Sequence, residues 1–342
     1  MVYQVGIIGA GLQGKRRATA ISTMQNANVA TVADINEETA RTFSELFHCR
    51  HTTDWISVVS DPEIKVILVC TPPHLHEEIA ISAIRQGKHV LCEKPLASST
   101  DQAKRMMEEA KKNRVKLGCG FNLRHHPAIR QVHEWVTAGT IGNIISLRSR
   151  YGIGGREGYE NDWRTNPEIS GGGELMDQGP HLLDLAQWFL GKIDSVTGLL
   201  QTAYWPIAPV EDNAFIILQS EQDAIASLHV SWTQWKPIFS LEIHGTDGYA
   251  IAEGLGGAYG TEKAIFGKRD FNAPFQESVV EFRGNDQSWK LDLDNFFSEF
   301  NDPSKLPESA ASGLSVMALI EALYKSHQER KTVKINHQEL RI

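Results

Sequence analysis

The sequence predicts an α/β protein with two parts: an N-terminal domain built on a doubly wound parallel sheet, and a C-terminal α+β domain with a large open, mostly antiparallel sheet. Up to about residue 120, short apolar runs alternate with helical patterns, which is typical of a parallel sheet. From Phe121 onward, apolar and polar residues alternate with period two, which indicates strands with one covered face. We therefore expect one domain over residues 1–121 and a second over residues 122–342.

The N-terminal elements follow in regular order. Asn36 opens one expected helix, and Ser99 with Gln102 forms a capping-box pair that opens another, which ends near Asn113. The expected strands cover residues 3–8, 29–33, 66–70, 89–92 and 115–120, and two further helices run to about residue 24 and over 77–86.

The C-terminal part combines alternating strands with helices. The absence of a Pro/Ser-rich linker and of internal repeats suggests two tightly packed domains, with a cleft between them as the natural place for chemistry. The expected strands cover residues 144–151, 213–219, 224–232 and 239–244, and the helices 127–138, 179–190, about 291–300 and 309–329.

Composition narrows the class of protein. The chain has 342 residues, of which 41% are hydrophobic, and it contains no apolar run of about eighteen residues. We expect no membrane span, no secretory signal and a cytoplasmic location. The net charge of −8 argues against a nucleic-acid-binding surface. No C-x-x-C pair occurs, so four cysteines are expected to be reduced core residues: Cys49, Cys70, Cys92 and Cys119.

A glycine motif follows the first expected strand. Gly9 permits a tight turn, Gly11 lets a pyrophosphate approach the backbone, and Gly14 lets the helix pack closely on the sheet. Asp34 ends the second strand, where a carboxylate can accept both hydroxyls of an adenosine ribose. The phosphates would lie at the helix N-terminus, near Leu12 and Gln13. This pattern predicts a dinucleotide site.

The residues beside this site favour NAD as the cofactor. Asp34 would repel the 2′-phosphate of NADP, and Ile35 offers that phosphate no partner. The basic residues Lys15, Arg16 and Arg17 keep NADP open as an alternative.

Two loops follow later strands, at the sheet edge where ligands bind in such folds. Pro72 and Pro73 stiffen the first loop, which suits a surface lying against the apolar ring of a nicotinamide. His76 at its end is either part of that site or an ordinary helix-entry residue, and Lys94 alone could be a solvated surface lysine. The residues expected at the cofactor from these loops are Thr71, Pro72, Pro73, His76, Glu93 and Lys94.

A third segment carries residues suited to acid-base chemistry. Asp177 stands just before the helix opened by Gly179-Pro180, and His181 lies in the first turn of that helix. Asp184 shares a helix face with His181 and could fix its tautomer. The plainer interpretation is that His181 is a core histidine.

The three motifs together resemble the Gfo/Idh/MocA oxidoreductases, the glucose-fructose oxidoreductase and inositol dehydrogenase family. The resemblance rests on Gly9-x-Gly11-x-x-Gly14, on Glu93-Lys94-Pro95, on the segment from Gly173 to Asp184 and on residues 121–127. It implies a nicotinamide-dependent oxidoreductase of a sugar, sugar derivative or cyclitol such as inositol, with an N-terminal Rossmann domain and a C-terminal open-sheet domain. It also implies a homodimer or homotetramer formed through the C-terminal sheet.

The resemblance implies a role for each candidate catalytic residue. Lys94 would hydrogen-bond the reacting hydroxyl or carbonyl, His181 would be the general acid/base, and Asp177 would orient or share the proton. An imidazole that titrates near neutral pH suits such alternation, and an ammonium stabilises developing alkoxide charge.

The glycine-rich stretch from Tyr151 to Asn166 is expected to border the substrate. Tryptophan can stack on a sugar face, and arginine can bind hydroxyls, a carboxylate or a phosphate. The alternative is a surface loop with a structural tryptophan. The expected substrate-binding residues are Lys94, Arg124, Tyr151, Arg156, Trp163, Arg164, Asp177 and His181.

Three other functions compete with this interpretation. Tyr259 and Lys263 have the spacing of a short-chain dehydrogenase, but they lie in a glycine-rich region far from the dinucleotide motif. A metal enzyme could use the histidines, but no carboxylate or cysteine completes a ligand spacing, so no metal is expected. A non-catalytic NAD-binding sensor of the same fold would be expected to lack Lys94, Asp177 or His181. The histidines in question are His74, His76, His125, His126 and His181.

Overall fold

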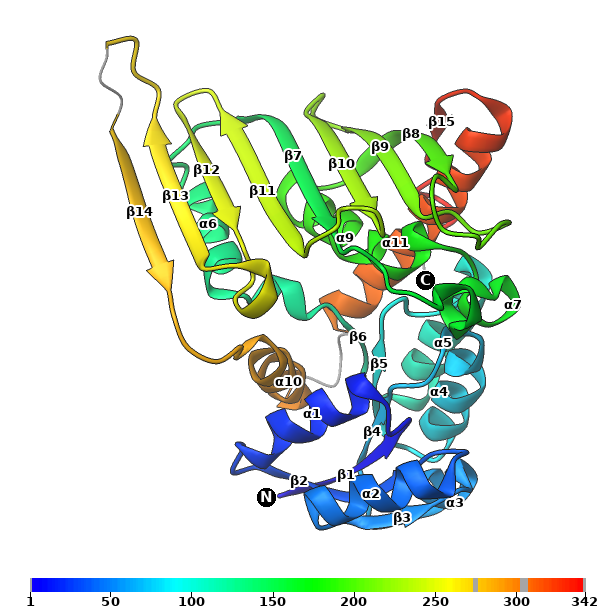
Figure 1. The fold of residues 1–342 in the computed structure, drawn as a ribbon. Helices are drawn as coiled ribbons and strands as arrows, with labels where there is room; N and C mark the ends of the chain where they lie inside the picture. The colour runs from blue at the N-terminus through cyan, green and yellow to red at the C-terminus, as the bar shows by residue number, and fades with distance from the viewer. Residues whose placement is uncertain (1, 273–275, 302–306, 341–342) are drawn as a thin grey trace. The chain divides into compact units, whose positions relative to one another are not determined.

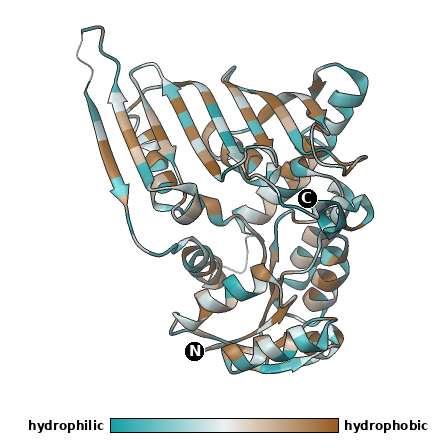
Figure 2. Cartoon of the chain, viewed as in Figure 1, coloured by the Kyte–Doolittle hydropathy of each residue, from teal (hydrophilic) through white to brown (hydrophobic). Residues whose placement is uncertain are grey.

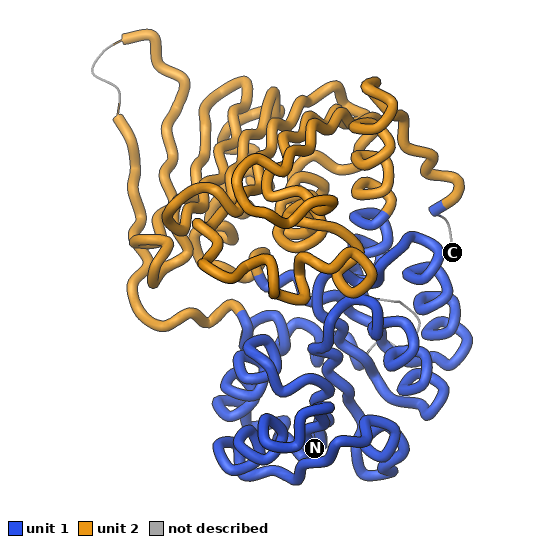
Figure 3. The backbone as a smooth tube through the Cα atoms, turned by 45° about the vertical axis from the view of Figure 1, so that its right-hand side comes forward, with its two compact units in different colours: residues 1–122, 289–317, 340–342 blue, residues 123–288, 318–339 orange. Residues whose placement is uncertain are grey.

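The computed structural model describes residues 2–272, 276–301 and 307–340. The chain divides into two compact units, and the chain passes from the first unit to the second at residues 122–123 (Figure 3). Residues 289–317 and 340–342, which we expected in the second domain, group instead with the first unit. The first unit comprises Met1–Asn122, Trp289–Met317 and Leu340–Ile342, and the second comprises Leu123–Ser288 and Ala318–Glu339.

The first unit contains a six-stranded parallel sheet with the order β3-β2-β1-β4-β5-β6 (Figure 1). This is the strand order of a doubly wound dinucleotide-binding fold, in which ligands bind where the order reverses, here between β1 and β4. The strands are β1 (Tyr3–Ile8), β2 (Ala27–Ala33), β3 (Arg50–Thr52), β4 (Val66–Val69), β5 (His89–Glu93) and β6 (Leu117–Gly120). The helices are α1 (Leu12–Ser22), α2 (Glu37–Phe47), α3 (Trp55–Ser60), α4 (His76–Arg85) and α5 (Thr100–Asn113).

Side-chain caps explain where several of these helices begin. The side chain of Asn36 accepts a hydrogen bond from the Thr39 N–H at 2.9 Å and so starts α2. Ser99 caps α5 through the N–H of Gln102, as predicted. The Gln102 side chain accepts from the N–H of Ser98, one residue earlier than an ideal capping box requires.

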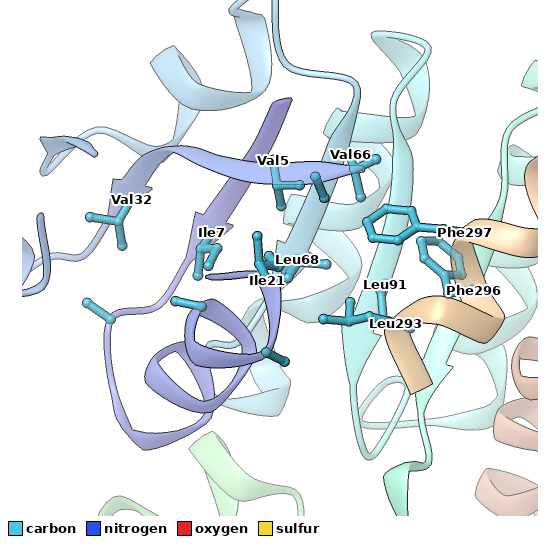
Figure 4. Close-up of a cluster of buried hydrophobic side chains, with 14 of the residues drawn as sticks. Val5, Ile7, Ile21, Val32, Val66, Leu68, Leu91, Leu293, Phe296 and Phe297 are labelled. Atoms are coloured by element: carbon cyan, nitrogen blue, oxygen red, sulfur yellow. The ribbon is translucent and has the colours of Figure 1, made fainter. Parts of the chain in front are cut away.

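The core of the first unit explains why the chain returns to it after residue 288. Side chains of β1, β2, β4 and β5 form one apolar cluster (Figure 4). Leu293, Phe296 and Phe297 of α10 (Ser288–Ser298) complete this cluster and are at most 5% exposed. The Phe297 ring also stacks on Tyr3 of β1, with 5.5 Å between centroids. Helix α10 is therefore part of the first hydrophobic core.

The second unit contains a nine-stranded sheet with the order β14-β13-β12-β11-β7-β10-β9-β8-β15. Only the β7–β10 pair is parallel in the described sheet, so the predicted mostly antiparallel sheet is confirmed. The strands are β7 (Ile144–Gly152), β8 (Ile193–Gln201), β9 (Asn213–Ser220), β10 (Ile225–Ser231), β11 (Ile238–Gly245), β12 (Gly248–Glu253), β13 (Glu262–Lys268), β14 (Glu277–Phe282) and β15 (Val333–Lys334).

Helices cover one face of this sheet. Helix α6 packs against β12, β13 and β14, and α9 packs against β7 and β10. Figure 2 shows the alternation of apolar and polar residues along the strands, and in β9 every second residue from Phe215 to Gln219 is exposed. In the described part of the chain, every helix is too short or too polar to span a bilayer. The helices are α6 (Pro127–Thr137), α7 (Pro167–Ser170), α8 (Glu174–Asp177), α9 (Gly179–Leu190) and α11 (Glu308–Glu329), which contributes to both units.

Candidate active site

The three motif glycines meet different physical requirements. Gly9 has a φ of +103°, and a Cβ there would lie 2.5 Å from the carbonyl oxygen of Cys70. A Cβ on Gly14 would overlap the carbonyl oxygen of Gly9. Gly11 differs, because apart from Gly11 and its adjacent backbone no described atom lies within 4 Å of the place where its Cβ would be. Packing therefore requires Gly9 and Gly14, whereas Gly11 leaves open space beside the turn.

This open space adjoins the N-terminus of α1. Gly11 is the N-cap residue, and among the described side chains none caps this helix or places an acid in its first turn. The first N–H groups of a helix attract an anion, because they lack intrahelical partners and lie at the positive end of the dipole. Leu12 is 62% exposed, so the first turn faces water. The turn thus fits the pyrophosphate of a dinucleotide.

Asp34 is held against the same turn. Its Oδ2 accepts a hydrogen bond from the Ala10 N–H at 2.9 Å, and its Oδ1 accepts from the Asn36 N–H at 3.0 Å. These bonds fix the carboxylate at the end of β2 while each oxygen keeps a further lone pair. Ile35 beside it is 91% exposed and offers no polar group. A carboxylate in this position fits a ribose diol and disfavours a 2′-phosphate.

Arg17 is not available to a 2′-phosphate. Its side chain is 1% exposed, its Nε donates to Glu93 at 2.7 Å, and its Nη1 donates to Asp292. Its guanidinium also lies 4.8 Å from the ring centroid of Trp289. Burial alone would lower the pKa of Arg17, but the two carboxylates outweigh it and raise that pKa. Of the three basic residues that kept NADP open, Lys15 and Arg16 remain.

His76 joins the two loops that follow β4 and β5. The ring is fully buried, with Nδ1 2.9 Å from the carbonyl oxygen of Pro95 and Nε2 2.8 Å from that of Thr71. Burial lowers its pKa, although the two carbonyl groups oppose this effect. Both ring nitrogens thus face backbone oxygens, which favours a structural role for His76. Lys94, in the second of these loops, is half-buried.

In the second unit, the α8–α9 junction gathers several predicted residues. Asp177 ends α8, and His181 lies in the first turn of α9 with 6% of the residue exposed. The Nε of Arg164 lies 3.6 Å from Asp177 Oδ2. The ring of Tyr151 makes an edge contact with His181, with 6.0 Å between centroids. The structure therefore brings these four residues of the predicted substrate site together.

Charges at this junction influence one another. Burial disfavours the charge of Arg164, but Asp177 and Asp162 outweigh it and raise its pKa. Burial, the hydroxyl of Tyr259 and the carboxylates of Asp177 and Glu174 raise the pKa of Tyr151 well above its ordinary value. Tyr151 therefore stays protonated at neutral pH and can donate a hydrogen bond.

Arg156, Trp163 and Arg124 have other surroundings. Arg156 pairs with Asp162 and remains largely exposed, while Trp163 is 37% exposed beneath the guanidinium of Arg164. Arg124 makes two hydrogen bonds of 2.7 Å to Asp184, which is 1% exposed. Asp184 could also fix the tautomer of His181, and Arg124 is an expected substrate contact. The bidentate pair favours a role in holding α9.

Several residues of the junction were not among the expected site residues. Glu174 is fully buried, and the amide of Gln178 lies 2.7 Å from its Oε1 and 3.2 Å from the Tyr151 carbonyl. Tyr259 lies against Tyr151, with 5.7 Å between ring centroids. Its assumed partner Lys263 lies on β13 and pairs with Glu281. Tyr259 therefore belongs to the surroundings of Tyr151 and not to a helical Tyr-x-x-x-Lys pair.

Glu211 was also missed, although it supports α8. Its Oε1 accepts from the Leu175 N–H at 2.9 Å and from the Tyr324 hydroxyl at 3.0 Å, and its carbonyl accepts from the Glu174 N–H. A Cβ on Gly173, the N-cap residue, would overlap the Glu211 backbone. Glu211 thus takes the place of a side-chain cap on the helix that carries Asp177.

Two of the histidines that a metal enzyme could use, His76 and His126, contact other groups. Among the described residues, no group of three His, Cys, Asp or Glu side chains could hold a metal ion. His76 contacts two carbonyl groups, and the buried His126 lies 3.2 Å from Glu262.

Both units match known protein families. Residues 3–121 match an oxidoreductase family model described as an NAD-binding Rossmann fold, and residues 129–251 match the GFO/IDH/MocA C-terminal domain. Levoglucosan dehydrogenase of Pseudarthrobacter phenanthrenivorans is 26% identical, with 97% of each chain covered. Inositol 2-dehydrogenase of Rhizobium meliloti is 25% identical over 98% of this chain and 100% of that protein.

The chain is also similar to a third dehydrogenase over about half its length, and to a solved structure over nearly its whole length. Glucose-6-phosphate 3-dehydrogenase of Bacillus subtilis is 32% identical over 57% of this chain and 55% of that protein. A structure of levoglucosan dehydrogenase in complex with NADH and levoglucosan has a TM-score of 0.90 and 25% identity, and covers 98% of this chain and 100% of that chain.

Proposed function

We propose a function for this chain, which belongs to the GFO/IDH/MocA family of oxidoreductases. The chain transfers a hydride between NAD and a secondary alcohol or ketone of a sugar, a sugar derivative or a cyclitol. The relatives include dehydrogenases of levoglucosan and of inositol that match nearly the whole chain. The observation that carries the proposal is that one chain combines the Asp34-bound glycine turn with the Asp177–His181 junction.

The residues of the first unit fit NAD. Asp34 would accept the hydroxyls of the adenosine ribose, and the N–H groups of Leu12 and Gln13 would bind the pyrophosphate beside Gly11. Thr71 and the two prolines after it would lie near the nicotinamide. Glu93 holds α1 through Arg17. NAD supplies the hydride acceptor or donor when it is bound.

The chain's own residues would move the proton. His181 would take the hydroxyl proton when the alcohol is oxidised and return it when the ketone is reduced. Lys94 would hydrogen-bond the reacting oxygen and stabilise its developing negative charge. Asp177, which lies 3.6 Å from the Nε of Arg164, would orient His181 or share its proton.

The test is turnover, followed through the absorbance of reduced nicotinamide. Purified protein is assayed with NAD and NADP against anhydrosugars, inositols, aldoses and sugar phosphates. We expect turnover with NAD, and a loss of about a hundredfold or more in kcat for both Lys94→Ala and His181→Ala. Lys111→Ala and His244→Ala, two exposed positions, serve as matched controls.

Two results would contradict this proposal. Turnover that survives the double substitution of Lys94 and His181 would remove them from the catalytic machinery. Dinucleotide binding without turnover of any compound in the panel would favour a non-catalytic sensor of the same fold.

We also propose that a second copy of the chain covers the outer face of the large sheet. Leu199, Phe215 and Ile217 on β8 and β9, with Ile225 on β10, are 46–54% exposed. Leu199 and Phe215 are direct cross-strand partners, so the apolar residues form a continuous patch. We expect Phe215→Asp to halve the molar mass measured by light scattering. Phe271→Asp, at another exposed aromatic position, should leave the mass unchanged.

We propose that the enzyme acts in the cytoplasm. All four cysteines are free thiols, although Cys92 and Cys119 are neighbours on β5 and β6. Free neighbouring thiols agree with a reducing compartment.

A further inference from the structure

Two large aromatic side chains of the second unit lie side by side at the surface. Tyr204 is 63% exposed and Trp235 is 62% exposed. Their ring centroids are 4.7 Å apart and their planes meet at 81°. Each ring therefore shields only part of the other, and the pair forms a corner with two open aromatic faces. Exposed apolar rings in contact with each other are unusual enough to suggest a binding role.

The backbone at Trp235 is held in an unfavourable conformation. Its φ of +58° lies in the left-handed region, which a bulky residue seldom adopts and which costs about 1–2 kcal/mol. The Gln234 N–H donates to the Ile153 carbonyl at 3.1 Å, and Gly154 packs directly on the Trp235 backbone. Because the indole stays exposed, burial of this side chain does not offset the strain. Such strain is often retained at binding sites.

Tyr204 is also fixed in place. Asp212 is fully buried and accepts hydrogen bonds from the N–H groups of Ala203, Tyr204 and Trp205 at 2.7, 2.8 and 3.0 Å. Burial alone would raise the pKa of Asp212, but these bonds outweigh it and lower the pKa. The ionised carboxylate therefore clamps the segment that carries Tyr204. The backbone that carries each of the two rings is therefore fixed by contacts within the second unit.

Further aromatic side chains next to this pair pack against the expected substrate segment, residues 151–166. Tyr159 makes edge contacts with Trp205 and Trp232, with centroid distances of 5.8 and 4.8 Å. A side chain on Gly155 would overlap the indole of Trp205. The Tyr159 carbonyl accepts a hydrogen bond from the Asp162 N–H at 3.0 Å, and Asp162 pairs with Arg164, whose Nε lies 3.6 Å from Asp177 at the α8–α9 junction. Trp205 in turn contacts Tyr204, with 5.2 Å between centroids, so a series of contacting rings leads from Tyr159 to Tyr204 and Trp235.

We propose that Tyr204 and Trp235 form an accessory subsite that stacks on a second carbohydrate ring of the substrate, beyond the ring that is oxidised. The C–H faces of a sugar ring pack well on aromatic planes while its hydroxyls stay in water, and tyrosine and tryptophan suit such half-wet positions. The substrate class is then a glycoside or disaccharide. This inference rests on the proposed function, because the reacting ring is assigned to Asp177 and His181.

The experiment compares substrates that share one reacting ring. The value of kcat/KM is measured for a monosaccharide and for disaccharides that contain it, with the unmodified enzyme and with Trp235→Ala, Tyr204→Ala and Trp235→Phe. We expect both alanine variants to lose roughly three- to tenfold in kcat/KM for the disaccharides and to be unchanged for the monosaccharide. Trp235→Phe should retain most of the preference. Phe271→Ala, at an exposed aromatic position, is the matched control.

A second arm measures binding without turnover. Calorimetric titration of the same sugars should show tighter binding of the disaccharide, and Trp235→Ala should abolish this advantage. If no sugar is turned over, the proposed function fails while the titration still decides about the subsite. Equal binding of both sugars would overturn the subsite. A change in molar mass caused by Trp235→Ala would also overturn it, since the pair would then be a subunit contact.

Discussion

The guanidinium of Arg17 in α1 donates to the carboxylate of Glu93 at the end of β5, and both side chains are almost completely buried. This bond connects the helix that begins at the glycine turn with the residue directly before Lys94. Asp292 of α10 completes the group with a second short bond to Arg17. One buried cation therefore fixes the helix of the expected pyrophosphate site and the loop of the expected catalytic lysine together.

Substitution of Arg17 tests this connection. In Arg17→Met, two buried carboxylates lose their cation, and we expect the free energy of unfolding to fall by about 3–5 kcal/mol. The measurement is urea unfolding followed by circular dichroism. Arg41→Met is the control, because the Arg41–Glu45 pair is exposed and should contribute no more than about 0.5 kcal/mol. A similar small loss for both variants would refute the structural role of Arg17.

The motif glycines should respond differently to the same small change. Gly11→Ala meets open space at an extended backbone conformation, so we expect stability to be kept and the affinity for NAD to fall. Gly14→Ala forces a methyl group into the Gly9 carbonyl, so we expect the melting temperature itself to drop. Thermal unfolding with and without NAD separates the two effects. If Gly14→Ala and Gly11→Ala melt at the same temperature without NAD, the packing role of Gly14 is contradicted.

Asp34 should set the choice of cofactor. In Asp34→Ser the acceptor for two ribose hydroxyls and the charge that repels a 2′-phosphate are both weakened. We expect the ratio of kcat/KM for NAD to that for NADP to fall by about tenfold or more, corresponding to at least ~1.4 kcal/mol. Asp54→Ser, at a helix cap away from the glycine turn, is the control. An unchanged ratio would remove Asp34 from cofactor recognition.

Glu211 should make stability depend on pH. Burial raises its pKa in the folded protein above the ordinary value of 4.5, so the folded state keeps this proton to higher pH than the unfolded chain. The stability from this group is fully present below 4.5 and falls as the pH rises through the raised folded value. Urea unfolding at several pH values should therefore show a flatter profile for Glu211→Gln.

The control for that profile is Glu157→Gln, at an exposed position. It should reproduce the pH dependence of the unmodified protein. If Glu211→Gln follows the same curve as this control, Glu211 does not titrate in the expected range.

Much of the fold could be predicted from local patterns in the sequence. The apolar runs of β1, β4 and β5 and the caps at Asn36 and Ser99 could be identified from the sequence, because each depends on neighbouring residues. Strand β3 carries only three residues, Arg50–Thr52, which are too few and too polar to show a pattern. The helix near residue 291 was expected, but periodicity shows only that it has an apolar face and not which core that face joins.

In the candidate site, too, local motifs could be predicted from the sequence, whereas contacts between distant residues could not. The glycine motif, Asp34 and the Asp177–His181 spacing are local signals, and they could be read from the sequence. The partner of Arg124 is 60 residues away, and the partners of His76 are backbone oxygens that no motif specifies. Glu211 lies 36 residues from the N–H that it caps. Contacts of this kind depend on the sheet topology.

The place of α10 in the first core has a consequence for synthesis on the ribosome. Residues 123–288 are, in terms of the gene, an insertion into the first unit. Leu293, Phe296 and Phe297 are translated only after that insertion, which takes on the order of ten seconds or more at typical elongation rates. The strands of the parallel sheet are therefore synthesised before the α10 side chains that complete their hydrophobic core. During that interval the apolar surface that α10 covers in the folded protein lacks its partner.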